Sequence, residues 1–168
     1  GTALLLGSTG KSIRTLATEG PPILAGAVSR DYKLCAFGDL SGGLRVVDVE
    51  TGMLIHSDNV HKSTIRQIEF VDPDSAVLSL CEAGRLIRTS LADRSTQEYL
   101  PSPGVRFFSM LADRSRALVV LGVDKKTVSD QGTMNSVATF QPNAITGRAE
   151  MLTVSSMSAK PILPVGVL

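Results

Sequence analysis

Residues 32–61 read YKLCAFGDLSGGLRVVDVETGMLIHSDNVH. Two short apolar runs, 34–37 and 44–49, flank a glycine-rich turn at 39–43. A second turn at 50–52 leads into a third run at 53–55. Short apolar runs joined by tight turns that contain glycine are typical of antiparallel strands. The stretch therefore predicts most of one antiparallel sheet, and the rest of the chain repeats its plan.

The same alternation of apolar runs and turns divides the whole chain into units. We expect the end of one unit at 1–20, fuller units at 21–63, 64–104 and 105–158, and the first strand of an incomplete unit at 159–168. The third fuller unit carries a polar insertion at 124–135. The strands are predicted at 3–6, 23–28, 32–37, 44–49, 53–55, 64–71, 76–80, 85–91, 96–100, 105–111, 117–123, 136–141, 148–154 and 161–168.

An internal likeness accompanies this pattern. Residues 10–15 (GKSIRT) resemble residues 84–89 (GRLIRT), and each follows an apolar run. Self-similarity at a fixed spacing is the sequence signature of a repeat protein. The likeness predicts a repeat of 37 residues, with two repeats between the matching segments.

One motif near the N-terminus has the ending of a phosphate-binding loop, which reads GxxxxGK[S/T] between a strand and a helix. Gly10, Lys11 and Ser12 fit its last three positions, but Leu5 stands where the first glycine is required. The segment after Ser12 is too short for the helix, because it soon reaches the Gly-Pro-Pro run at 20–22. We therefore predict a turn between two strands here, and no cofactor.

Composition narrows the choice of function. The 168 residues carry 17 basic and 16 acidic side chains, a net charge of +1, which argues against a surface built on bulk basicity. The apolar runs are far shorter than the ~20 residues of a membrane span, and no signal-peptide pattern is present. We expect an intracellular, cytoplasmic protein.

The cysteines and histidines suggest a structural role. Cys35 and Cys81 both lie in apolar runs, as expected of buried free thiols. Two cysteines and two histidines without ligand-like spacing predict no zinc site.

The arrangement resembles the WD40-repeat β-propeller family, whose four-stranded blades repeat every ~40–45 residues with a Gly-His pair and a Trp-Asp pair. Residues 44–52 (LRVVDVETG) sit where the family has the strand that ends in Trp-Asp. Val47 replaces the Trp and Asp48 keeps the Asp, while Val60 and His61 stand at the Gly-His position. Later units carry Thr89-Ser90 and Phe140-Gln141 at the Trp-Asp positions.

The resemblance implies an all-β chain, a propeller fragment of four-stranded antiparallel blades with about three blades and partial blades at each end. Ser41 and Ala83 occupy the positions of the family's network Asp, so we expect a partial network, with Asp48 and His61 as the remnants of the signature. A β-sandwich is the structural alternative, because it also uses regular short strands.

A propeller closes with ~4–8 blades. We therefore expect this chain to form part of a larger propeller, completed by another segment or by another chain. Alone, it should be poorly soluble or should oligomerise, because open blade faces and strand edges promote association.

The resemblance also implies a non-catalytic scaffold that binds other proteins within a multi-subunit assembly, including the remainder of the propeller. The candidate contacts lie in turns before third strands, between blades and in the insertion: Asp39, Ser41, His61, Lys62, Glu82, Arg85, Lys125 and Lys126. Three further residues, Arg30, Asp31 and Tyr32, are expected on the opposite face.

Two other functions remain open. Nucleic-acid or phosphoinositide binding would use a belt of Arg14, Arg45, Arg88 and Arg148, which occupy comparable blade positions. A propeller enzyme is the least favoured, because two histidines and no acid cluster at matching positions offer little for catalysis.

Overall fold

The computed structural model describes residues 1–17, 19–71, 73–99, 104–110, 117–121 and 136–140. These residues form strands joined by turns and contain no helix, which confirms the all-β prediction. The strands are β1 (Ala3–Leu6), β2 (Ser12–Ala17), β3 (Ile23–Val28), β4 (Leu34–Asp39), β5 (Gly43–Asp48), β6 (Leu54–Asn59), β7 (Ile65–Val71), β8 (Ala76–Cys81), β9 (Leu86–Ser90), β10 (Thr96–Tyr99), β11 (Val105–Met110), β12 (Ala117–Leu121) and β13 (Ser136–Phe140).

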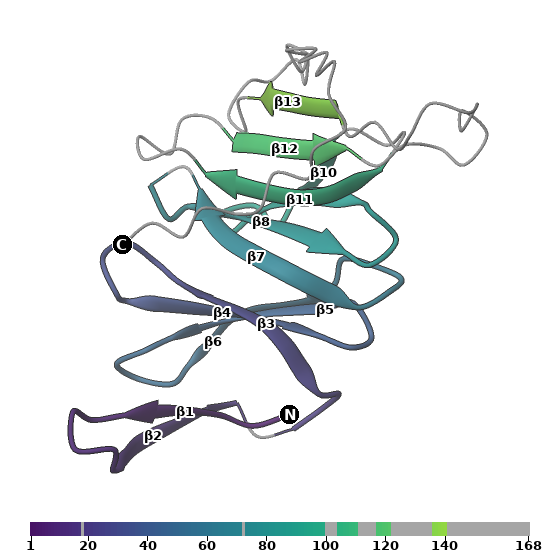
Figure 1. The fold of residues 1–168 in the computed structure, drawn as a ribbon. Helices are drawn as coiled ribbons and strands as arrows, with labels where there is room; N and C mark the ends of the chain where they lie inside the picture. The colour runs from purple at the N-terminus through teal and green to yellow at the C-terminus, as the bar shows by residue number, and fades with distance from the viewer. Residues whose placement is uncertain (18, 72, 100–103, 111–116, 122–135, 141–168) are drawn as a thin grey trace.

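The strands form four antiparallel sheets in which each strand pairs with the next along the chain. The first sheet is β1–β2, the second β3–β6, the third β7–β10, and the fourth has β11–β13 as its described strands. Figure 1 shows the sheets stacked from β1 and β2 to β13. The second and third sheets fall within the predicted units 21–63 and 64–104, and β7 packs across β3 and β4.

Most strand limits lie within a few residues of the predicted ones. The main exception is β6, predicted at 53–55 but formed by Leu54–Asn59. Its last three residues are polar and exposed, because β6 is the outermost strand of its sheet. The strands predicted at 148–154 and 161–168, and the insertion at 124–135, lie outside the described residues.

The turns repeat every 42 residues, so the predicted spacing of 37 is wrong. Backbone conformations with positive φ recur at this interval, at Tyr32 and Asp74, at Gly42 and Gly84, and at Gly10, Gly52 and Arg94. Gly10 therefore corresponds to Gly52, in the turn before an outermost strand. The sequence likeness between 10–15 and 84–89 aligned Gly10 with Gly84 instead, but Gly84 lies in a different turn of the repeat.

Apolar side chains fill the space between successive sheets. Between the second and third sheets, the core consists of Ala25, Ala36, Leu44 and Val46 on one side and Ile65, Ile68, Phe70 and Val77 on the other. Neighbouring residues of one strand serve different cores: Val46 faces the third sheet, and Val47 belongs to the core beside β1–β2. Strand β8 is covered on both faces, so all its residues are buried, and all except Ser79 are apolar.

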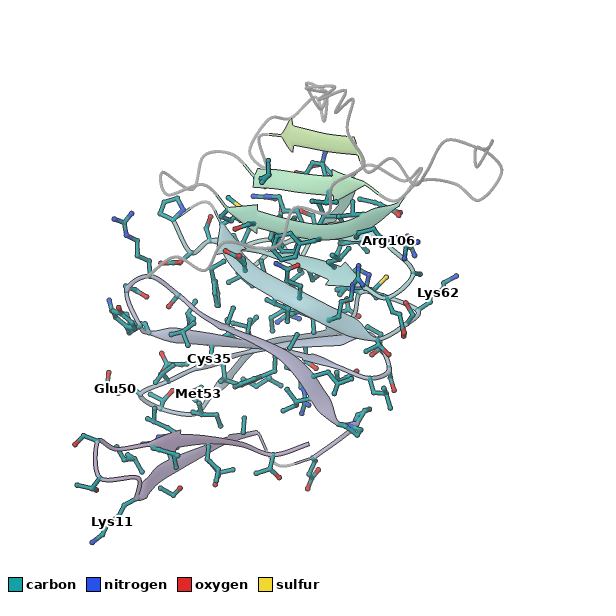
Figure 2. The ribbon with its side chains drawn as sticks, in the orientation of Figure 1. Lys11, Cys35, Glu50, Met53, Lys62 and Arg106 are labelled. Atoms are coloured by element: carbon teal, nitrogen blue, oxygen red, sulfur yellow. The ribbon has the colours of Figure 1, made fainter. Side chains whose placement is uncertain are left out.

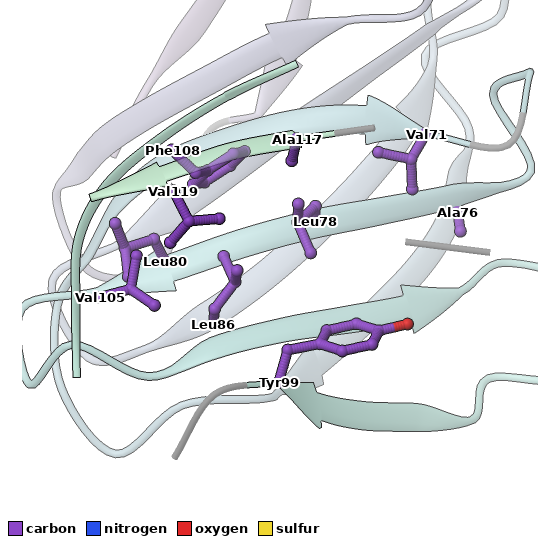
Figure 3. Close-up of a cluster of buried hydrophobic side chains, with 10 residues drawn as sticks. All are labelled: Val71, Ala76, Leu78, Leu80, Leu86, Tyr99, Val105, Phe108, Ala117 and Val119. Atoms are coloured by element: carbon purple, nitrogen blue, oxygen red, sulfur yellow. The ribbon is translucent and has the colours of Figure 1, made fainter. Parts of the chain in front are cut away.

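A second core joins the third and fourth sheets. Figure 3 shows Phe108 and Val119 of the fourth sheet beside Leu78, Leu80 and Leu86 of the third. Tyr99 closes this cluster from the outermost strand β10. The same mode of packing thus recurs from one sheet to the next.

The turn that resembled a phosphate loop closes a β-hairpin, as predicted. The Gly7 amide donates to the Lys11 carbonyl at 2.9 Å, and the Gly10 amide donates to the Gly7 carbonyl at 2.9 Å. The residues after Lys11 form strand β2, not a helix. Both cysteines are buried free thiols. None of the described residues belongs to a helix able to cross a membrane.

Truncation of Phe70 tests the inter-sheet core. We expect Phe70→Ala to lower the free energy of unfolding by about 3–5 kcal/mol, because it empties a fully buried site. The control Met53→Ala, at an exposed turn, should stay within about 0.5 kcal/mol of the wild type. Urea unfolding followed by far-UV circular dichroism measures both. Equal losses in the two variants would show that the sheets do not pack through Phe70.

Candidate protein-binding surface

The turns gather at two opposite ends of the sheets. One end, called the linker end, carries the turns 40–42 and 82–85 and the linker 60–64 between the second and third sheets. The other, called the hairpin end, carries the turns 29–33, 49–53 and 91–95. Figure 2 separates the two, with Lys62 on the right and Glu50 and Met53 on the left. The structure thus brings the predicted contacts that it describes to one end, and places Arg30, Asp31 and Tyr32 at the other.

Hydrogen bonds tie the linker end into one continuous surface. The Leu40 amide donates to the Pro22 carbonyl at 2.9 Å, and the Thr64 hydroxyl donates to the Leu40 carbonyl at 3.0 Å. The Glu82 amide donates to the Thr64 carbonyl at 2.8 Å. Turns from two different sheets are therefore fixed on the same linker residue. Exposed turns held on a rigid scaffold are well suited to recognition.

Asp39 shapes a turn and does not face a partner. Its side chain is only 5% exposed, and its Oδ1 accepts the amides of Ser41 at 2.9 Å and Gly43 at 2.8 Å. An aspartate that caps the amides after it forms an Asx turn. This corrects the prediction of Asp39 as a contact residue: its carboxylate is used within the fold.

His61 is also buried, with 3% of its side chain exposed. Its Nε2 lies 2.9 Å from the Ser79 hydroxyl, which donates in turn to the Ile87 carbonyl at 3.3 Å. The His61 ring is thus a hydrogen-bond partner of a buried hydroxyl on the neighbouring strand β8. Burial, chiefly, lowers the pKa of His61 to about 4. The predicted contact is therefore corrected here too: His61 is a neutral side chain inside the fold.

The remaining predicted contact residues differ in their exposure and in whether another side chain of the chain binds them. Ser41, Lys62 and Glu82 are exposed. Arg85 is held by Glu98 in a two-pronged ion pair, Nε to Oε1 at 2.7 Å and Nη2 to Oε2 at 2.5 Å. This pairing raises the pKa of Arg85 and lowers that of Glu98. Lys125 and Lys126 lie outside the described residues.

Leu40 belongs to the surface but was missed from the sequence. Its side chain is 50% exposed, next to Ser41 and in the turn that contacts Thr64. The available signal was a large apolar residue inside a glycine-rich turn, outside the alternation of the strands. Leu40 adds an apolar contact to polar and charged neighbours, the mixture found in protein interfaces.

The predicted arginine belt has internal partners. Arg14 Nη1 donates to the Thr51 carbonyl at 3.0 Å, and Arg45 Nη1 donates to the Glu19 carbonyl at 2.6 Å. Arg88 also has an interaction partner, and Arg148 lies outside the described residues. Arg14 and Arg45 thus connect separate segments of the fold instead of forming a free basic stripe.

At the hairpin end, aspartates hold the turns. Asp48 Oδ1 accepts the Thr51 amide at 2.7 Å and the Thr51 hydroxyl at 2.8 Å, and these bonds lower the pKa of Asp48. Asp31 accepts the Ser29 hydroxyl at 2.7 Å. The Asp74 carboxylate accepts the Arg30 amide at 2.9 Å, which connects the second and third sheets.

The described residues offer little for covalent or metal chemistry. Among them, no three His, Cys, Asp or Glu side chains gather as a metal site. His61 and Ser79 have the contact of a base and a nucleophile, but both are buried and the hydroxyl proton is donated to Ile87. A nucleophile must reach its substrate, so this pair serves the fold.

Substitution of Gly42 tests the close contact between turn and linker. At φ +91° its Cβ would collide with the carbonyl oxygen of His61. The control is Gly10, at φ +77° with nothing within 4 Å of its Cβ. We expect Gly10→Ala to cost about 1–2 kcal/mol from backbone strain alone, and Gly42→Ala a further ~1–3 kcal/mol from the collision. Denaturant unfolding measures both, and equal costs would exclude the contact.

The burial of His61 predicts a loss of stability in acid. Its pKa is about 4 when folded and 6.5 when unfolded, so the unfolded state binds more protons as the pH falls from 6.5 to 4. We expect the free energy of unfolding to decrease by about 3 kcal/mol across this window. His61→Gln keeps a donor for Ser79 but cannot titrate, so it should lose this part of the slope. His56, also buried with a lowered pKa, should maintain part of the slope in both proteins. Identical slopes would contradict the assignment.

Comparisons with known proteins bear on the fold. No protein-family model and no curated protein matches this sequence. Among solved structures 852 chains match, and a shared fold does not by itself specify an activity. One is hydrazine synthase from Kuenenia stuttgartiensis, with a TM-score of 0.69 and 15% identity over 89% of this chain. The match covers 42% of that chain, so this sequence spans less than half its length. At this identity the likeness concerns the fold alone.

Proposed function

We propose that this chain forms part of a WD40-like β-propeller that acts as a non-catalytic platform for other proteins in a multi-subunit assembly. Four-stranded antiparallel sheets stack face to face, and their turns recur every 42 residues. This interval lies within the ~40–45 residues of a WD40 blade. Asp48 holds a turn at the position of the family's Asp, as a structural remnant of the signature would.

The linker end is the observation that carries the proposal. Its exposed side chains, Leu40, Ser41, Lys62 and Glu82, come from segments that hydrogen bonds fix to one another. A partner that binds such a surface pays little entropy for ordering it. The proposed role is therefore recognition by a preformed surface.

Nucleic-acid or phosphoinositide binding is the weaker candidate. Arg14 and Arg45, which would supply it, donate to carbonyl groups of this chain. Phosphate binding depends on free cations and falls steeply with salt. Recognition of a protein, in contrast, needs only an exposed charge such as Lys62 beside an apolar contact such as Leu40.

A double substitution that places acidic side chains on the surface tests the linker end. We expect Leu40→Glu combined with Lys62→Glu to reduce recovery of partner proteins at least tenfold in quantitative affinity purification. The matched control, Tyr32→Ser combined with Met53→Ser, changes two exposed side chains at the hairpin end and should recover the same partners as the wild type. Urea unfolding of both variants verifies that the fold is intact.

The opposite result has a definite meaning. If the linker-end variant keeps its partners and the hairpin-end variant loses them, the platform lies at the hairpin end. Binding of a fluorescent single-stranded DNA, or of phosphoinositide vesicles, that falls steeply with salt would favour the weaker candidate instead.

A further inference from the structure

The first strands of three successive sheets carry an irregularity at the same place. The pairing of β3 with β4 skips Leu24, the pairing of β7 with β8 skips Arg66, and the pairing of β11 with β12 skips Arg106. Each skipped residue is the second of its strand. A β-bulge of this kind leaves one residue out of the ladder and redirects its side chain. We call Leu24, Arg66 and Arg106 the bulge row.

The side chains of the bulge row reach solvent at the linker end, where each strand begins. The residues before two of the bulges, Ile65 and Val105, are fully buried. In contrast, Leu24 is 55% exposed, and Arg66 and Arg106 are exposed as well. Because β7 packs beside β3 and is bound to β11, the row crosses three neighbouring sheets.

Hydrogen bonds from β7 to β11 hold the two arginines of the row together. Arg66 Nη2 donates to the Val105 carbonyl at 3.3 Å and to the Arg106 carbonyl, so the guanidinium of one bulge is anchored on the backbone of the next. Gln67 Nε2 donates to the Phe108 carbonyl at 2.5 Å, and Gln67 Oε1 accepts the Phe108 amide at 3.4 Å. The two positive charges therefore lie at a fixed place on the surface.

The chain does not neutralise these charges with its own described residues. The Arg106 guanidinium has no hydrogen bond or ion pair to any of them, and neither have Nε and Nη1 of Arg66. Lys62, in the linker before β7, adds a third exposed cation, and Figure 2 shows it on the same side of the molecule as Arg106. Glu82, the exposed acid of this end, forms no ion pair with them. The linker end thus offers cations that need an external partner.

Apolar side chains accompany the cations. Leu24 belongs to the row, and Leu40 lies in the turn whose amide donates to the Pro22 carbonyl at 2.9 Å, two residues before Leu24. Nucleic-acid binding rests on many cations that each neutralise a phosphate. Three cations beside two leucines, on a chain with a net charge of +1, suit a short acidic segment of a protein better.

We infer that the bulge row binds an acidic segment of the partner protein, with carboxylates on Arg106 and Arg66 and an apolar side chain on Leu24. The inference rests on the proposed function, because it names the chemistry that the linker end recognises. A free guanidinium binds a carboxylate through two parallel hydrogen bonds, which an ammonium group cannot form. The identity of Arg106, and not only its charge, therefore matters.

Fluorescence anisotropy with the full chain tests the inference. The probe is a fluorescein-labelled peptide of alternating glutamate and leucine, and the reference probe has glutamine in place of glutamate. We expect the acidic probe to bind about tenfold more tightly than the reference, because only its carboxylates form charge-assisted hydrogen bonds with arginine. The difference should shrink as salt is added, since the site is exposed.

Variants of the row show where the probe binds. Arg106→Glu should weaken binding of the acidic probe about tenfold or more, and Arg106→Lys should weaken it less, because it keeps the charge but loses the paired hydrogen bonds. Leu24→Glu leaves both arginines in place and should also weaken binding, by repulsion. The matched control Arg30→Glu makes the same change of charge at an exposed residue of the hairpin end and should bind like the wild type. Far-UV circular dichroism verifies the fold of each variant.

Equal affinity for the two probes would overturn the inference, as would unchanged binding in both Arg106→Glu and Leu24→Glu. Tighter binding of fluorescent single-stranded DNA or of phosphoinositide vesicles, lost in Arg106→Glu, would also overturn it, because the row would then serve phosphate. The partner-recovery experiment with Leu40→Glu and Lys62→Glu is read separately. If that variant loses its partners but the acidic probe does not bind, the platform stands and the acidic segment is wrong.

Discussion

Apolar packing between successive sheets is the constraint on which this molecule depends. The third sheet packs against a neighbouring sheet on each face, so its inner strand β8 is buried along its whole length and is apolar at every position except Ser79. Aspartates at the turns and at the ends of strands fix the local geometry. Asp39, Asp48 and Asp31 each bind groups of their own turn. The cores bring the sheets together, and the aspartates decide how the chain passes from one strand to the next.

The linker end is held in place because the stacked sheets bring turns and linkers of neighbouring sheets into contact. The turn before β5 contacts both the linker that precedes its own sheet, at Pro22, and the linker to the next sheet, at Thr64. Gly42 permits this close approach because a side chain there would meet the carbonyl of His61. The surface is thus positioned by backbone groups and by the Thr64 hydroxyl, and its exposed side chains take no part in these contacts. Such a separation suits a platform whose scaffold is constant and whose contacts are specific.

Strand positions could be predicted because central strands leave a direct record in the sequence: each is an apolar run bounded by turn residues. The polar end of β6 left no such record, since an outermost strand needs only backbone pairing there. The repeat length was misjudged because the likeness of 10–15 to 84–89 compares two different turns. Asp39 and His61 were predicted at the surface because polar residues in turns usually lie there. Their burial depends on partners, the amides of Ser41 and Gly43 and the hydroxyl of Ser79, that only the fold brings near.

The strand order has a consequence for how the protein is made. Every strand pairs with its immediate neighbour in the chain, and each sheet packs on the one completed before it. Among the described strands, the hydrogen-bonding partners within each sheet come from consecutive segments. A chain with this plan can acquire structure vectorially, as it leaves the ribosome, with each finished layer serving as the template for the next. The sheets can thus form in the order in which they occur in the sequence.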